Sequence, residues 1–285
     1  MKWKIVTDSG CDIPETEIDR TRIGYECVPF IITVGEEDYI DNKNLKIEEM
    51  LRSMEESQKA GKTACPSPAA WMSAYEGAEQ VIVITMSGAL SGSYRSAVAA
   101  RHMFLEQYPD RHIHVWDSKM AGSGIGILVR EVLRDIQAGK EYEAIAEHLK
   151  ETIERTHIIF ALVSFQNLIK AGRMHWLVGY AVNKLKLCVI GKGTQDGRLE
   201  ILHKIRGTGR IYEKIVKAMT EQEFTEGEVI ISHCFNRKGA EQLAHMIKHQ
   251  FPKVRITILN ARGICSYYAE RGGLIVAFLS CQHIS

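Results

Sequence analysis

A turn rich in serine and glycine follows a short apolar segment in the first half of the chain. Residues 81–85 are apolar and largely β-branched, which is typical of a buried strand. Residues 86–94 read Met-Ser-Gly-Ala-Leu-Ser-Gly-Ser-Tyr, and apolar side chains recur at helical spacing after them. Ser91, Gly92 and Ser93 are therefore predicted at a helix N-terminus, where backbone N–H groups attract anions. This turn has three serines, Ser87, Ser91 and Ser93. Their hydroxyls can donate to a carboxylate or a phosphate, or can simply cap the helix.

Two arginines stand beside glycines that end regular structure. Arg173 follows Gly172, which is expected to terminate a short helix, so its side chain is predicted to project from a loop. Arg206 lies in the similar run Lys-Ile-Arg-Gly-Thr-Gly. Each arginine is either a solvated cation near a helix end or a group that faces a ligand or a partner.

Composition bounds the class of protein. The chain has 285 residues, which exceeds what one core usually serves, so two domains are expected. Lys plus Arg number 36 against 35 Asp plus Glu, and this balance disfavours binding to nucleic acid. The seven cysteines are odd in number and form no Cys-x-x-Cys pair, so they are expected as reduced thiols in the cytoplasm. No apolar stretch is long enough to cross a bilayer, and no integral membrane association is expected.

The elements that must position the serine turn alternate between strand and helix as far as residue 156. Strands are expected at 4–7, 28–34, 81–85 and 112–116, and helices at 44–59, 69–79, 93–107, around 128–136 and at 142–155. The segment 63–68, Thr-Ala-Cys-Pro-Ser-Pro, is predicted as a loop because its prolines cannot continue a helix. This alternation favours an N-terminal α/β domain, residues 1–156, with a Rossmann-like parallel sheet that has helices on both faces.

The second half has a different pattern and is assigned to a C-terminal α+β domain, residues 157–285. Asp196-Gly197 lies between two apolar runs and predicts a hairpin. Strands are expected at 158–163, 187–190, 199–203, 229–232, 255–259 and 274–278, and helices at 165–171, 211–222 and 238–250.

Several motifs with catalytic or metal-binding chemistry are incomplete. The run Gly61-Lys62-Thr63 lacks the first glycine of a P-loop, and Ser91 is not framed as a nucleophile elbow. Two histidine pairs, 112 with 114 and 245 with 249, lack a third ligand at a useful spacing. No metal, no cofactor and no catalytic residue is therefore assigned.

Six motifs, taken in order, resemble the signatures of the DegV family. They are Lys-Ile-Val-Thr-Asp-Ser (4–9), Thr-Ala-Cys-Pro-Ser-Pro (63–68), Ser-Gly-Ala-Leu-Ser-Gly-Ser-Tyr (87–94), Val-Trp-Asp-Ser (115–118), Leu-Ile-Lys-Ala-Gly-Arg (168–173) and Asp-Gly-Arg (196–198). The resemblance spans nearly the whole chain, and the turn at residues 87–94 is its most specific part.

The resemblance implies a two-domain α/β protein that buries a fatty acid between its domains. Some members are the fatty-acid-binding subunits of bacterial fatty acid kinase, FakB. It implies that Thr63, Ser91 and the Gly92 backbone bind the carboxylate. Tyr268 occupies the place where many members carry a histidine, and a phenol can donate the same hydrogen bond. Further residues are expected to face the pocket or a partner: Ser87, Ser93, Ser118, Arg173 and Arg206.

The function expected from the sequence is binding of a long-chain fatty acid, presented to a separate kinase subunit by a protein without catalysis of its own. Two other functions stay open. One is an enzyme that acts on an acyl or phosphorylated substrate with Ser91 as nucleophile. The other is a sensory domain that binds a nucleotide or another anion at the serine turn.

Overall fold

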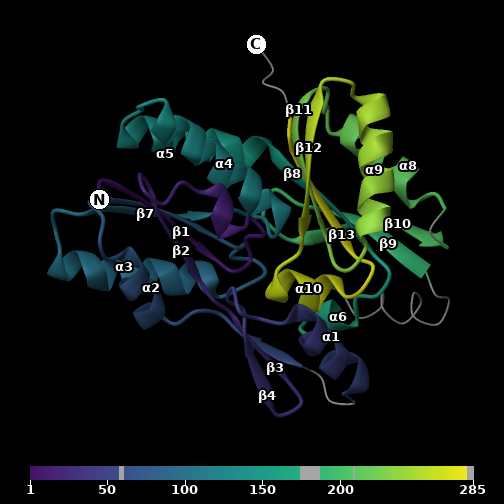
Figure 1. The fold of residues 1–285 in the computed structure, drawn as a ribbon, viewed down its shortest axis with the longest axis horizontal. Helices are drawn as coiled ribbons and strands as arrows, with labels where there is room; N and C mark the ends of the chain where they lie inside the picture. The colour runs from purple at the N-terminus through teal and green to yellow at the C-terminus, as the bar shows by residue number, and fades with distance from the viewer. Residues whose placement is uncertain (58–60, 174–186, 208, 281–285) are drawn as a thin grey trace.

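The computed structural model describes residues 1–57, 61–173, 187–207 and 209–280 (Figure 1). Its strands form three sheets, one parallel, one mixed and one small and antiparallel. This confirms the expected fold class, an α/β parallel-sheet unit followed by an α+β unit. The strand β8 (Thr156–Leu162) begins beside the predicted domain boundary at residue 156, which stays a prediction.

The parallel sheet carries the serine turn at the end of one of its inner strands. Its order is β2-β1-β6-β7, with every neighbouring pair parallel. The bounds are β1 (Trp3–Asp8), β2 (Gly24–Val28), β6 (Gln80–Thr85) and β7 (His112–Asp117). The turn follows β6 directly, so it lies at the carboxyl edge of the sheet, where α/β proteins bind ligands.

Helices cover both faces of this sheet because side chains alternate along its strands. On β1, Val6 packs with α2 (Pro68–Tyr75) and α3 (Ser93–Gln107), whereas Ile5 joins the apolar cluster that includes α4 (Ser123–Gln137). The helix α5 (Tyr142–Arg155) packs on α4. The predicted bounds of α3 and α5 are confirmed, and α2 is shorter than predicted.

One apolar run predicted as a single strand, 28–34, is divided between two sheets. Pro29 has no N–H to donate and ends β2, and β3 (Ile31–Val34) begins a three-stranded antiparallel sheet with the order β4-β3-β5. Its other members are β4 (Glu37–Ile40) and β5 (Lys62–Ala64), so Thr63 lies in a strand and not in the predicted loop. The helix α1 (Ile47–Glu56) starts after the predicted residue 44, and the predicted end at residue 59 lies outside the described residues.

The second half forms a six-stranded mixed sheet with the order β10-β9-β8-β13-β11-β12. Its strands besides β8 are β9 (Leu187–Gly193), β10 (Leu199–Arg206), β11 (Gly227–His233), β12 (Val254–Asn260) and β13 (Leu274–Leu279). The helices α8 (Ile211–Glu221) and α9 (Arg237–Gln250) cover one face, and α6 (Gln166–Lys170) follows β8. The β9–β10 hairpin confirms the prediction made from Asp196-Gly197.

The helix α4 connects the two large sheets. It packs against β6 of the parallel sheet and against β8, β11 and β13 of the mixed sheet. Side chains from both halves consequently share one apolar cluster, in which Ile5, Ile84, Leu128 and Ile230 are fully buried. In the described part of the chain, no helix combines the length and the apolar character needed to cross a bilayer.

The helix α10 (Gly263–Ala269) is not predicted by the sequence, which shows no capping side chain next to it. Carboxylates from the other half of the chain accept hydrogen bonds from the N–H groups at its start. Asp12 Oδ1 accepts from Arg262 N at 2.8 Å, and the two oxygens of Asp41 accept from Gly263 N and Ile264 N at 2.9 and 2.7 Å. These distant caps satisfy the N–H groups that a helix start leaves unpaired.

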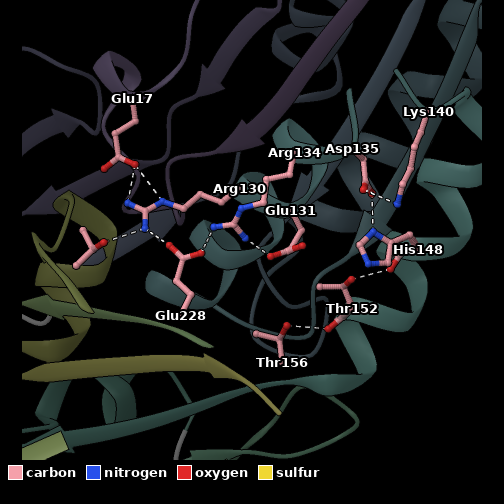
Figure 2. Close-up of polar contacts among 11 residues, drawn as sticks. Glu17, Arg130, Glu131, Arg134, Asp135, Lys140, His148, Thr152, Thr156 and Glu228 are labelled. Carbon is pink, nitrogen blue, oxygen red and sulfur yellow. Dashed lines mark hydrogen bonds and ion pairs between the residues drawn. The ribbon is translucent and has the colours of Figure 1, made fainter. Parts of the chain in front are cut away.

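A row of ion pairs crosses from the N-terminal segment to the mixed sheet (Figure 2). Arg130 of α4 donates to Glu17 Oε2 at 2.6 and 3.0 Å, to Thr257 Oγ1 at 2.9 Å and to Glu228 of β11. Arg134, one turn later, also donates to Glu228. Burial alone would raise the pKa of Glu228, but the two arginines outweigh it, and the pKa is lowered.

We expect Glu228→Gln to lower the free energy of unfolding at pH 7 by about 2 kcal/mol, because two partly buried guanidinium groups lose their shared charge. Because the pKa of Glu228 is lower in the folded than in the unfolded protein, its ionised carboxylate stabilises the fold at any pH above the unfolded-state pKa. This contribution is lost as the pH falls through the folded-state pKa. The difference between the two proteins should therefore shrink in urea unfolding below pH 4.5. Glu241→Gln is the matched control, since its pair with Arg237 is more than half exposed and should change stability by less than about 0.5 kcal/mol. If the loss of unfolding free energy in Glu228→Gln grew as the pH fell, the stabilising role of the ionised Glu228 would be contradicted.

Candidate functional site

An apolar pocket lies between the serine turn and the mixed sheet. About 650 Å³ of space in and around it is free of protein atoms, and this volume includes open solvent at its mouth. Three of the lining residues are Arg173, Cys265 and Tyr268. All the others have apolar side chains: Met86, Leu90, Ala121, Ile158, Phe160, Leu162, Leu168, Leu199, Ile264, Ala269 and Ile275. A pocket with such walls favours a ligand that is mostly hydrocarbon.

A pair of hydrogen-bonded hydroxyl groups includes one residue of the pocket lining, Tyr268. The Thr63 Oγ1 and Tyr268 Oη atoms are 2.9 Å apart, and either can donate to the other. Thr63 comes from β5 of the small sheet and Tyr268 from the last turn of α10, and both are partly exposed. Neutral hydroxyls in this position can donate to an anionic group that arrives at the pocket mouth.

The serine turn also contributes to the pocket lining. Leu90 lines the pocket, and Arg173 Nε donates to the Leu90 carbonyl oxygen. A Cβ added to Gly92 would lie 3.2 Å from Cys65 Sγ, so Gly92 faces the segment that follows Thr63. Ser91 Oγ accepts from Ser93 N at 3.1 Å, which places this hydroxyl at the start of α3. Of the four predicted carboxylate-binding residues, Tyr268 lines the pocket, Thr63 bonds Tyr268, and Ser91 and Gly92 follow the pocket residue Leu90 in the chain. Their role toward a carboxylate stays a prediction.

A buried carboxylate fixes the shape of the serine turn. Asp8, at the end of β1, accepts from Met86 N at 2.8 Å and from Ser93 Oγ at 2.5 Å, so it contacts both ends of the turn. Its other oxygen accepts from Gly10 N at 3.1 Å. Burial raises the pKa of Asp8 to about 6 against the effect of these three hydrogen bonds. Asp8 is not among the residues singled out from the sequence, although its place directly after a strand is a signal for it.

Three predicted serines have their hydroxyls engaged inside the protein. Ser87 Oγ donates to the Gly197 carbonyl oxygen at 2.7 Å, which ties the turn to the β9–β10 hairpin. Ser93 bonds Asp8, as above, and Ser118 Oγ accepts from Met120 N at 3.0 Å. All three side chains are buried and stand outside the pocket lining. These hydrogen bonds position loops, and a direct role of the three serines toward a ligand or a partner stays a prediction.

The two predicted arginines are exposed but differ in position. Arg173 lines the pocket mouth, whereas Arg206 lies at the end of β10 and does not contribute to the lining. Most of the pocket wall was not predicted as site residues, because Ile158, Phe160 and Ile275 look like ordinary core residues in the sequence. Only their spatial relation to the serine turn marks them as pocket residues.

Other chemistries receive little support from the geometry. The hydrogen bond recorded for the Ser91 hydroxyl comes from a backbone N–H, and none of the recorded side-chain bonds in the described part of the chain joins Ser91 to an imidazole or a carboxylate. No group of three or more His, Cys, Asp or Glu side chains in that part could hold a metal ion.

Comparison with known proteins gives a consistent result over the whole length. The family model for DegV, a family of uncharacterised proteins, matches residues 2–280. A DegV domain-containing protein of Streptococcus pyogenes serotype M1 is 37% identical over 278 residues, which cover 98% of this chain and 99% of that one. A similar protein of Streptococcus gordonii is 37% identical over 282 residues, with 98% and 99% of the two chains covered.

Solved structures with bound fatty acids have the same fold. The fatty acid kinase B3 protein of Streptococcus pneumoniae, loaded with linoleic acid, aligns with a TM-score of 0.96 and 34% identity over 99% of this chain and 100% of that one. A DegV family protein of Eubacterium eligens, loaded with heptadecanoic acid, has a TM-score of 0.93 and 32% identity over 98% and 100%. A third, from Ruminococcus gnavus and refined with vaccenic acid, has a TM-score of 0.90 and 30% identity over 97% and 99%.

The raised pKa of Asp8 makes a prediction about stability. A carboxyl whose folded pKa lies above its unfolded value stabilises the fold only at low pH, and that contribution is lost as the pH rises from about 4 to about 6. Asp8→Asn cannot ionise, so the free energy of unfolding of the wild type minus that of the variant should fall by about 2 kcal/mol over this interval. Urea unfolding of both proteins at half-unit steps of pH measures the difference. A difference that rises, or stays level, between pH 4 and 7 would be inconsistent with a buried, destabilised carboxylate.

Proposed function

This chain belongs to the DegV family, and on that premise we propose that it binds a long-chain fatty acid, with the acyl tail in the apolar pocket and the carboxylate at the Thr63–Tyr268 end. The observation that carries the proposal is one pocket with hydrocarbon walls and hydroxyl donors at its mouth. The fatty acids in the related solved structures support it.

The tail supplies the driving force for binding. Burying a methylene group contributes about 0.8 kcal/mol, so a chain of about sixteen carbons gains roughly 12 kcal/mol before costs. Association and ordering remove several kcal/mol of that gain. The remainder is enough for tight binding without any contribution from an ion pair.

The head group requires hydrogen bonds. An ionised carboxylate in an apolar pocket is costly unless donors satisfy it. Thr63 and Tyr268 now share one hydrogen bond, and rotation of the two hydroxyl hydrogens would let each donate to a carboxylate oxygen. Ser91 and the Gly92 backbone complete the proposed set. Because these donors are neutral, the carboxylate stays chemically accessible.

The finer proposal is that a separate kinase phosphorylates the bound carboxylate and that this chain is the non-catalytic subunit. Two observations support it: the similar Streptococcus pneumoniae protein is a fatty acid kinase B3 protein, and Arg173 and Arg206 are exposed. We place the protein in the cytoplasm, where such a kinase and its ATP would be found. The free thiols of the described cysteines fit that compartment.

We expect the double substitution Thr63→Val and Ser91→Ala to weaken binding of oleic acid about 30-fold, because two hydrogen bonds to a charged group are lost. Calorimetric titration of both delipidated proteins measures the change. The alcohol of the same chain length is the sharper probe: the wild type should prefer the acid over the alcohol, and the double variant should lose that preference. Thr33→Val, the same change on the neighbouring strand with a hydroxyl bonded to Asp38, is the control. Equal preference in all three proteins would refute the head-group assignment, and displacement of the lipid by ATP would favour the nucleotide-binding alternative.

The kinase proposal predicts a separation of binding from transfer. Arg206→Ala should leave fatty acid affinity unchanged and should lower acyl phosphate formation about tenfold when ATP and a bacterial fatty acid kinase catalytic subunit are added, since an exposed arginine can contact the partner or its phosphate. Phosphate release or acyl hydroxamate formation measures the rate. Arg237→Ala, an exposed arginine at the start of α9, is the control. Acyl phosphate made by this chain alone would instead indicate an enzyme.

A further inference from the structure

One buried side chain is shared by the linings of two pockets. Ile158 lines the apolar pocket and also a second, more polar pocket, where about 850 Å³ of space is free of protein atoms, open solvent included. Ile158 and the polar-pocket residue Met120 are both buried, with 4% and 3% of their surfaces exposed. The Ile158 side chain therefore stands as a partition between two cavities of opposite character.

The partition is held in place from two sides. A Cβ added to Gly124 of α4 would lie 2.8 Å from Ile158 Cγ2, and one added to Gly193 of β9 would lie 2.8 Å from its Cγ1. Real side chains do not come so close, so the isoleucine fills the space that the two glycines leave. Its position is consequently fixed by the backbone of a helix and the backbone of a strand.

The space behind the partition does not suit hydrocarbon. The polar pocket is lined by Lys119, Glu154, His157, Thr194 and Gln195, among others. An acyl chain that entered it would displace water from these groups and provide no hydrogen bonds in return. A methylene group beyond Ile158 would therefore not contribute the favourable free energy that a methylene group gains in the apolar pocket.

We propose that Ile158 sets the upper limit of acyl chain length by closing the apolar pocket against the polar one. This inference rests on the proposed fatty acid function and adds the property that decides which fatty acids are bound. Within the limit, affinity should rise about fourfold for each added methylene, which follows from about 0.8 kcal/mol per buried group. Beyond the limit, affinity should fall.

The test compares Ile158→Ala with Ile159→Ala. Both changes remove three carbon atoms from a buried side chain of β8, but Ile159 faces the layer of α8 and α9 on the other side of the sheet. Loss of stability should therefore be similar in the two variants. Only Ile158→Ala opens the partition, and the space gained corresponds to about three methylene groups.

Dissociation constants for the saturated acids from twelve to twenty-two carbons should show an optimum in the wild type. In Ile158→Ala we expect the optimum at a chain length about two or three carbons greater. Acids two carbons longer than the wild-type optimum should bind this variant about tenfold more tightly than they bind the wild type. Ile159→Ala should keep the wild-type optimum. Ile158→Val, a milder change that preserves the fold if alanine does not, should shift it by about one carbon.

The outcomes separate this inference from the function on which it rests. An optimum at the same length in the wild type, Ile158→Val and Ile158→Ala would overturn the role of Ile158 and leave fatty acid binding intact. A shift in Ile159→Ala of the same size would also overturn it, because general loosening of the sheet would then explain the result. Failure of the wild type to bind any acid of the series would overturn both proposals.

Discussion

Buried carboxylates of the N-terminal segments hold the two parts that form the mouth of the pocket. Asp8 bonds both ends of the serine turn, and Asp12 and Asp41 supply the first hydrogen bonds of α10, which carries Tyr268. Burial raises the pKa of all three groups, so each is a costly element that the fold retains. The hydrogen bonds of these three carboxylates fix the geometry of the serine turn and of the start of α10, which the neighbouring residues in the sequence do not determine.

The sequence predicts those parts of the fold whose causes are local. The strands of the parallel sheet, α3, α5 and the β9–β10 hairpin follow from side-chain periodicity and turn residues close to them in the chain. The small sheet and α10 were missed because their causes are distant. Pro29 divides an apolar run between two sheets, and α10 is capped by residues more than 200 positions away in the sequence.

The same distinction applies to the site. Ser91 and Gly92 were singled out from the serine turn, and Thr63 and Tyr268 from the resemblance. In the structure Tyr268 lines the pocket, Thr63 bonds it, and Ser91 and Gly92 follow the pocket residue Leu90. Ser87, Ser93 and Ser118 belong to the same motifs, yet their hydroxyls hold loops together. A motif therefore identifies which loops are special without saying which side chain in them faces the cavity. The apolar wall gives no signal in the sequence, because a side chain that lines a pocket and one that fills a core have the same chemistry.

The hydrogen bond between Thr63 and Tyr268 joins residues separated by 205 positions. Such a contact exists only when two segments far apart in the chain have come together, which carries the entropy cost of closing a long loop. A molecule that binds at this junction is therefore recognised only by the fully assembled chain, and it stabilises that state in proportion to the logarithm of its concentration. In a cell this would make loaded molecules longer-lived than empty ones, because proteases cleave the opened chain, and the abundance of the protein would follow the supply of the molecule that binds there.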